Sequence, residues 1–138
     1  MLQTDNARAR AFGDLRQQVA AAGPGQRVDL IAEQARIIRR HIIATIDAAR
    51  AGHIGGDLSV TDVLATLYFG VLRVDPSAPD VAARDRFILS KGHCAAALYS
   101  TLARAGYFSE DELPTFMAAG SALNGHPNRN KVPGIETN

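Results

Sequence analysis

Apolar residues recur at every third or fourth position through the first half of the chain, and this spacing is typical of amphipathic helices. It is clearest over residues 28–51, where arginines lie between the apolar positions, and we predict one long helix there. His41 falls inside this helix and is interpreted as a residue at the edge of the core or surface, without a ligand role. Residues 1–27 are more polar and are interpreted as a partly helical N-terminal extension, which ends at the Gly-Pro-Gly sequence of 23–25.

Three glycines surround one histidine in the segment 51–56, Ala-Gly-His-Ile-Gly-Gly, and this composition predicts a loop. Ser59 and Asp62 then have the spacing of a capping pair, which predicts that a second helix opens at Ser59. One face of this helix is apolar and consists of Val60, Val63, Leu64, Leu67 and Val71. His53 is therefore expected in a loop between two helices.

A short apolar run, Phe87-Ile88-Leu89-Ser90, comes next after a polar loop with two prolines. Its length and composition predict a buried strand that ends at Lys91-Gly92-His93. The small residues that follow predict a helix from Cys94, and Gly106 predicts where this helix ends.

The last part of the chain has weaker signals. Ser109 and Glu112 form another capping pair, and a short helix is predicted from there to Gly120. Residues 121–138 show no helical period and contain two glycines and two prolines. They are predicted to be either a long ordered loop or a frayed end.

The composition is that of one globular domain with nearly balanced charge. The chain has 138 residues, 46% of them hydrophobic, which suffices for a single core. The 15 Lys and Arg face 14 Asp and Glu, without a basic tract, so we expect neither nucleic acid nor a membrane as a partner. There is no export signal and no apolar run of about 18 residues. The single cysteine, Cys94, excludes an internal disulfide and favours a reducing compartment, so we expect a cytoplasmic protein.

Arginine supplies most of the positive charge, with 13 Arg to 2 Lys. A site for a phosphorylated small molecule would therefore depend more on guanidinium groups or backbone amides than on lysine. For Arg84 and Arg86 we expect a structural role instead, in which they hold the loop through Asp75, Asp80 or Asp85.

Glycine precedes three of the four histidines, in Gly52-His53, Gly92-His93 and Gly125-His126. Only 12 of the 138 residues are glycine, so chance explains this pairing poorly. Histidines on tightly turning, exposed backbone are placed where binding groups usually lie.

Three hypotheses account for these histidines. A three-histidine metal centre is chemically allowed, but the spacings of 40 and 33 residues match no metal motif. A binding module with purely structural histidines is the second. The third is a site for an anionic, hydroxylated ligand, in which imidazoles donate to phosphate and hydroxyl oxygens and move protons near neutral pH.

Four short blocks follow one another along the chain. They are Gly-His-Ile-Gly-Gly at 52–56, Arg-Asp-Arg-Phe-Ile-Leu-Ser-Lys-Gly-His at 84–93, Gly-Ser-x-x-x-Gly-His-Pro at 120–127 and Val-Pro-Gly-Ile-Glu at 132–136. Together, from about Arg36 to Asn138, they resemble the N-terminal thiamine-diphosphate-binding domain of transketolases. The sequences of the blocks are most similar to those of the split bacterial and archaeal forms, in which the N-terminal and C-terminal polypeptides are separate.

The resemblance implies an α/β fold: the N-terminal, helix-rich part of a three-layer α/β/α architecture with a parallel sheet. Residues 28–138 would form the first part of this domain. Family members continue with a glycine-rich loop and a Gly-Asp-Gly…Asn segment that holds Mg²⁺ and the diphosphate, and neither occurs in this sequence. We therefore expect an incomplete domain, with no metal ligands of its own.

The resemblance also implies roles for the histidines. His93, with Gly92, matches the family position that contacts the cofactor diphosphate. His53 matches a histidine at both cofactor and substrate that assists proton transfer, and His126 matches one that binds donor-sugar hydroxyls. One departure is Ile54, where many family members have proline; isoleucine also occurs in the split forms.

The implied function is that of an N-terminal portion of a transketolase, which passes a two-carbon ketol unit from a ketose phosphate to an aldose phosphate by means of thiamine diphosphate and Mg²⁺. The implied partner is a C-terminal transketolase subunit or the rest of the chain, in a homodimer or heterotetramer. Alone, the chain is expected to be inactive. Two alternatives are another thiamine-diphosphate enzyme, such as 1-deoxyxylulose-5-phosphate synthase, and a non-catalytic interaction module derived from this fold.

Overall fold

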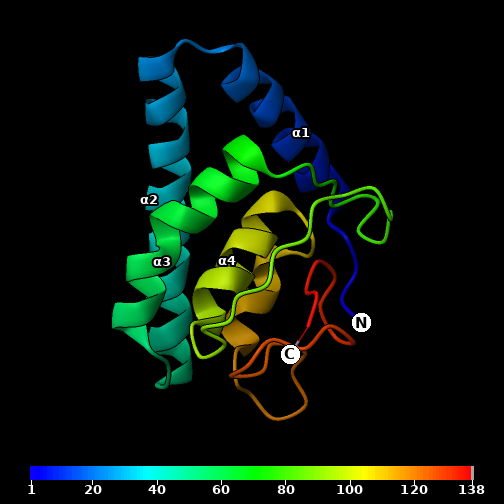
Figure 1. The fold of residues 1–138 in the computed structure, drawn as a ribbon. Helices are drawn as coiled ribbons and strands as arrows, with labels where there is room; N and C mark the ends of the chain where they lie inside the picture. Colours follow the sequence, from blue (N-terminus) through cyan, green and yellow to red (C-terminus); the bar gives the residue numbers. More distant parts are fainter. Residues whose placement is uncertain (138) are drawn as a thin grey trace.

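A computed structural model describes residues 1–137, and these residues fold into helices joined by ordered loops (Figure 1). No strand occurs among them. The elements are α1 (Asn6–Ala21), α2 (Pro24–Ala49), α3 (Ile54–Thr66), the π-helical turn η1 (Leu67–Val71), α4 (Ala95–Ala105) and the 3₁₀ helix η2 (Glu110–Thr115).

Helices α1 and α2 form a V that is closed by a short connection at residues 22 and 23 (Figure 1). Pro24 is the first residue of α2, where a proline costs no helical hydrogen bond. Arg27 turns its guanidinium back onto α1 and donates to the carbonyl oxygens of Val19, Ala20 and Ala22 at 3.1 to 3.3 Å. The last carbonyls of α1 are thereby satisfied by a side chain of the next helix.

Helix α4 lies at the centre of the molecule, and every one of its residues except Arg104 is buried. Helices α2, α3 and α4 pack against one another, and α1 packs against α4 and η1. Tyr99 and Leu102 of α4 are fully buried, as are Ile38 and Ile42 of α2. Helix α4 ends in the left-handed conformation at Gly106, with φ of 95°, as the sequence predicts.

The N-terminal segment contributes to this interior. Ala9, Phe12 and Val19 of α1 are buried, and the rings of Phe12 and Phe69 lie edge to face with centroids 5.2 Å apart. The division of the chain at residue 27 stays a prediction, but α1 packs on the core rather than standing apart from it.

Two predicted helix starts are wrong. The long helix begins at Pro24 instead of residue 28. The second helix begins at Ile54, with His53 as its N-cap residue, so Gly55 and Gly56 lie in its first turn instead of in a loop. The hydroxyl of Ser59 donates back to the carbonyl oxygen of Gly56 at 2.9 Å and caps nothing.

The predicted buried strand at Phe87–Ser90 is also wrong for the part of the chain that the structure describes. The segment has no helical or strand hydrogen bonding, and Ile88 is 58% exposed. Phe87 packs its ring edge to face on Tyr68, with centroids 6.0 Å apart. A strand requires a neighbouring strand to pair its N–H and C=O groups, and residues 1–137 supply none.

The predicted short helix after Ser109 is present but shorter than expected. Ser109 accepts a hydrogen bond from the N–H of Asp111 at 3.2 Å, and the 3₁₀ helix ends at Thr115 instead of continuing to Gly120. Beyond it, the chain is an ordered loop through residue 137, in which Leu123 and Val132 are fully buried. Of the two predictions for this region, the ordered loop is confirmed.

The first residues of the chain lie beside the loop that contains Lys131 (Figure 1). The N–H of Leu2 donates to the carbonyl oxygen of Lys131 at 2.9 Å, and the N–H of Asp5 donates to that of Gly106 at 3.1 Å. Both arginines of the second block also reach the C-terminal loop: Arg84 and Arg86 bind the carboxylate of Glu136. Their structural role fits the expectation, but the carboxylate that binds them is that of Glu136. Of the three expected aspartates, Asp85 contributes its backbone carbonyl oxygen, to which Arg84 donates at 3.3 Å.

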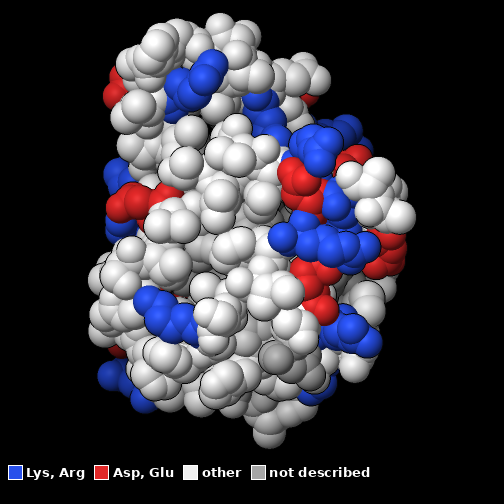
Figure 2. All heavy atoms as spheres, in the orientation of Figure 1, with Lys and Arg blue, Asp and Glu red and all other residues white. Residues whose placement is uncertain are grey.

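Charges gather along one side of the molecule, near the lower end of α1 and the loop after η1 (Figure 2). In this loop the Arg73 side chain binds Asp85 at 2.9 Å, and the N–H of Asp85 donates to the carbonyl oxygen of Arg73 at the same distance. The positive and negative groups alternate here, so the region offers no single-sign patch. None of the described helices is long and apolar enough to cross a membrane.

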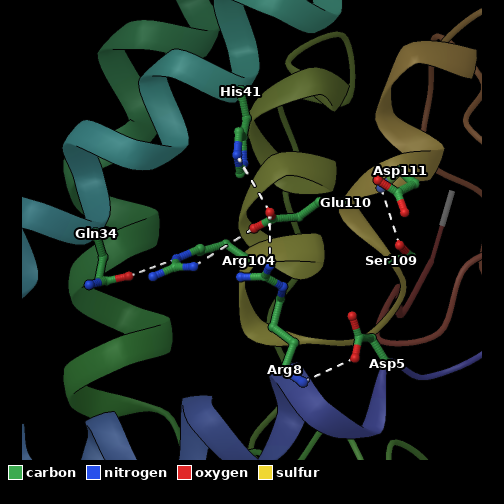
Figure 3. A network of polar contacts seen from close by, with 8 residues as sticks. All are labelled: Asp5, Arg8, Gln34, His41, Arg104, Ser109, Glu110 and Asp111. Atoms are coloured by element: carbon green, nitrogen blue, oxygen red, sulfur yellow. Dashed lines mark hydrogen bonds and ion pairs between the residues drawn. The ribbon is translucent and has the colours of Figure 1, made fainter.

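A polar network joins α1, α2, α4 and η2 (Figure 3). The carboxylate of Glu110 lies 3.0 Å from Arg8, 3.9 Å from Arg104 and 3.8 Å from Nε2 of His41. Arg104 also donates to Gln34 at 2.9 Å. Burial is the main factor that lowers the pKa of His41. His41 thus lies in α2 at the edge of the core, where the sequence placed it.

Candidate functional site

Two histidines meet where α3 and α4 begin. His53 is the N-cap residue of α3, and His93 lies two residues before the first residue of α4. Their rings pack edge to face, with centroids 4.8 Å apart and an interplanar angle of 62°. Both residues are exposed, so the paired imidazoles face outward from the junction of the two helices.

His126 joins this pair through Gly92. A Cβ added to Gly92 would lie 3.0 Å from Cδ2 of His126, which places the imidazole directly against the backbone next to His93. Tyr99 of α4 holds the loop that carries His126. Its hydroxyl donates to the carbonyl oxygen of Asn124 at 3.0 Å and to that of His126 at 3.4 Å. The three glycine-histidine pairs, distant in the sequence, therefore lie together in the structure.

Asp57 is a site residue that the sequence analysis missed. It lies in the first turn of α3 and is fully buried. Its Oδ1 accepts the backbone N–H of Ala97, in the first turn of α4, at 2.8 Å. Its Oδ2 is buried and has no hydrogen-bond partner among the described residues. An acidic residue directly before the apolar run of a helix looks like an exposed first-turn carboxylate, and only tertiary packing shows otherwise.

Two sets of opposing effects act on the pKa of Asp57. Burial raises the pKa of Asp57, while the N–H of Ala97 and the positive charges of Lys91 and the two paired histidines work in the other direction. Burial prevails, so the pKa of the carboxyl lies above its ordinary value. The group is costly to keep in its charged form at this position.

Lys91 and Cys94 lie beside the same junction. The Nζ of Lys91 is 3.5 Å from both the carbonyl oxygen of Gly56 and the hydroxyl of Ser59, on α3. Cys94 is buried, and burial together with the negative charge of Asp57 raises the pKa of its thiol. Cys94 is therefore a packing residue in this site, whereas Lys91 adds positive charge at its rim.

The donor set suits an anion more than a metal. Three imidazoles and a lysine ammonium can all donate hydrogen bonds to phosphate oxygens. Among residues 1–137, no group of three or more His, Cys, Asp or Glu side chains could hold a metal ion. Gly92 has no Cβ, so its backbone lies directly against the imidazole of His126. These features fit the diphosphate end of thiamine diphosphate, the cofactor that the family resemblance implies.

The class of protein, a thiamine-diphosphate-binding domain, is shown by a family model. Residues 31–138 match the family model "Transketolase, thiamine diphosphate binding domain". The chain therefore belongs to the transketolase family.

Relatives in this family include separate subunits. The chain is 46% identical to an apulose-4-phosphate transketolase subunit of Phocaeicola vulgatus, over 80% of this chain and 39% of that protein. It is 41% identical to a 6-deoxy-6-sulfo-D-fructose transketolase subunit of a Clostridium strain, over 80% of this chain and 40% of that protein. The chain thus spans about two fifths of the length of these subunits.

Solved transketolases have the same local fold. A transketolase from Leishmania mexicana superposes with a TM-score of 0.72 and 33% identity, over 76% of this chain and 16% of that protein. A Pichia stipitis transketolase in complex with sedoheptulose-7-phosphate gives a TM-score of 0.71 and 31% identity, with the same coverage. The helix-rich arrangement of these residues is that of the N-terminal transketolase domain.

Proposed function

We propose that this chain is the N-terminal part of a transketolase that transfers a two-carbon ketol unit between sugar phosphates in the cytoplasm. The observation that carries the proposal is the convergence of three exposed histidines at one helix junction: His53 and His93 in ring contact, and His126 against Gly92. The relatives that are named as transketolase subunits support the same reaction class.

Each histidine has a separate role in the proposal. His93, with the backbone of Gly92, would donate to the diphosphate of the cofactor. The exposed imidazole of His53 would move a proton between substrate oxygen and solvent, since imidazoles change protonation near neutral pH. His126 would hold hydroxyl groups of the donor sugar. When bound, thiamine diphosphate would supply the carbon nucleophile and electron sink for breaking the carbon–carbon bond.

The proposal includes a requirement for further protein. The family resemblance implies that the protein ligands of Mg²⁺ lie in a further polypeptide segment or a C-terminal subunit, within an assembled dimer or heterotetramer. Calorimetric titration of the isolated chain with thiamine diphosphate and Mg²⁺ tests this point. We expect binding weaker than micromolar, and micromolar or tighter binding would contradict the requirement.

A chimera tests the catalytic part of the proposal. The matching 111 residues of the Phocaeicola vulgatus subunit would be replaced by those of this chain, and the product would be assayed for ketol transfer together with its partner subunit. We expect activity in the chimera. Changing His53 to alanine should reduce the rate by about 10²-fold or more, the usual contribution of a positioned proton-transfer group. Changing His93 or His126 to alanine should lower the rate through weaker binding of the cofactor or of the donor sugar.

Arg50→Ala is the matched control for the chimera. Arg50 is exposed, ends α2 and pairs at 3.8 Å with Asp47, three residues earlier. Its substitution should leave the rate unchanged. A chimera that is active and keeps its full rate after each of the three histidine substitutions would refute the proposed roles.

A further inference from the structure

Asp57 occupies a position between the two loops that carry the paired histidines. His53 lies four residues before it on the same helix, and the N–H of Ala97, four residues after His93, donates to its Oδ1 at 2.8 Å. This is a charge-assisted hydrogen bond between the first turns of α3 and α4, and it is fully buried.

The same junction is packed closely. A Cβ added to Gly56 would lie 2.6 Å from the Sγ of Cys94, so α3 and the N-cap of α4 approach each other as far as their atoms allow. The hydrogen bond from the N–H of Ala97 reaches Asp57, the residue that follows Gly56 in α3. Sliding one helix along the other would break the bond and separate the two imidazole rings, which are 4.8 Å apart.

Burying the carboxyl group of Asp57 costs free energy, and within residues 1–137 only one hydrogen bond to that group offsets the cost. Its Oδ2 is buried without a partner among the described residues, and burial raises the pKa of the group. A buried polar atom without a partner destabilises a fold, so a carboxyl group retained at this position calls for an explanation. The explanation that the geometry supports is that Asp57 aligns the starts of α3 and α4, next to which the two histidines lie.

We infer that Asp57 is a positioning residue of the histidine site: its carboxylate ties α4 to α3 and thereby sets the ring contact between His53 and His93. The inference rests on the proposed function for the role of that contact in catalysis. Asp57 is fully buried, so its proposed effect on the reaction is exerted through the two histidines.

Two substitutions separate the hydrogen bond from the charge. Asp57→Ala removes the acceptor, whereas Asp57→Asn keeps an oxygen that can accept the N–H of Ala97. Asp62→Asn is the matched control, because Asp62 lies on the same helix but binds Arg39 on the surface at 2.6 Å. All three changes remove one negative charge from α3.

Nuclear magnetic resonance of the full chain provides the readout. We expect a ring-to-ring cross-peak between His53 and His93 in the unaltered chain, in Asp57→Asn and in Asp62→Asn. In Asp57→Ala it should fall at least several-fold, while the contact between Phe12 and Phe69 persists as an internal reference for the fold. An undiminished histidine cross-peak in Asp57→Ala, or its absence in the unaltered chain, would overturn the inference.

A second measurement decides the question if Asp57→Ala does not fold. In the unaltered chain, the amide signal of Ala97 should follow the protonation of Asp57, with a midpoint above the ordinary value of 3.8. This response should vanish in Asp57→Asn and persist in Asp62→Asn. An Ala97 signal that does not respond to pH in the unaltered chain would overturn the inference.

Inorganic pyrophosphate, added in the same spectra, separates this inference from the proposed function. We expect it to shift the signals of both histidines in the unaltered chain, and to do so several-fold less effectively in Asp57→Ala. If pyrophosphate shifts neither histidine but the cross-peak depends on Asp57, the positioning role stands and the proposed diphosphate contact fails. If pyrophosphate acts equally on both chains, with the cross-peak intact, the positioning role fails alone.

Discussion

Glu136 binds two arginines that precede it by 52 and 50 positions, and it shows how single residues fix the long loops of this molecule. Its side chain is only 10% exposed, and that of Arg84 is 12% exposed. The sequence identified both arginines as structural, but it assigned them to aspartates nearby in the chain. Distance along the sequence was a poor guide, because the C-terminal loop folds back over the second block.

Replacing Glu136 by glutamine should destabilise the fold in a pH-dependent way. Burial raises the pKa of Glu136, but hydrogen bonds from Arg84 and Arg86 outweigh it and hold the pKa below its ordinary 4.5. A carboxyl with a depressed pKa in the folded state stabilises the fold above pH 4.5, and this stabilisation is lost as the pH falls through the folded-state pKa. At pH 7 we expect a loss of about 1–3 kcal/mol in the free energy of unfolding by urea.

The difference in the free energy of unfolding between the unaltered chain and Glu136→Gln should become smaller below pH 4.5, because the carboxyl of Glu136 then becomes neutral as well. Glu33→Gln is the control, because Glu33 makes the same kind of pair with Arg36 on the exposed surface of α2. It should change stability little. A Glu136→Gln chain as stable as the control at pH 7 would show that the buried pair contributes nothing.

At the scale of elements, helix ends are predictable where a local rule decides them. Gly106 ends α4 by the left-handed conformation that glycine favours, and the sequence alone predicts this. The start of α3 is different, because two glycines in the first turn disfavour a helix locally. Contact between Gly56 and Cys94 requires a residue without a side chain there, so packing overrides the local preference.

Gly106→Ala should be strongly destabilising. Its φ of 95° is unfavourable for alanine, and the added Cβ would collide with the backbone of Ala9 in α1. We expect a loss of more than about 1 kcal/mol in the free energy of unfolding, measured by urea denaturation. Gly13→Ala gives the opposite expectation, a gain of about 0.5–1 kcal/mol, because Gly13 lies inside α1 with open space around it. Equal effects of the two changes would contradict this explanation.

At the scale of the whole molecule, α1 closes the core although its sequence is polar. Only three of its 16 residues are buried, so its amphipathic pattern is weak and the sequence analysis assigned it to an extension. Phe12 nevertheless inserts between the other helices and meets Phe69. The Arg8–Glu110 ion pair fixes the same helix to η2 (Figure 3).

Phe12→Ala measures how far α1 belongs to the fold. Phe12 is 4% exposed, so its truncation should lower the free energy of unfolding by about 3–5 kcal/mol, through lost burial and a cavity. Leu2→Ala near the same terminus is the comparison, since Leu2 is only partly buried and should cost less. A loss below about 0.5 kcal/mol for Phe12→Ala would indicate that α1 is a detachable extension.

The sequence by itself determined the features that depend on local order: the helical character of the chain, the end of α4, the role of Ser109 as a cap, and the four blocks that identify the family. It also predicted the three histidines of the candidate site, because glycine next to histidine is a local signal. Tertiary structure alone decided that these histidines meet, that Asp57 is buried beneath them, that Glu136 is the partner of the arginines, and that Phe87–Ser90 forms no strand within residues 1–137. The physical reason is the same in each case: burial and pairing depend on neighbours from distant parts of the chain, which no local pattern specifies.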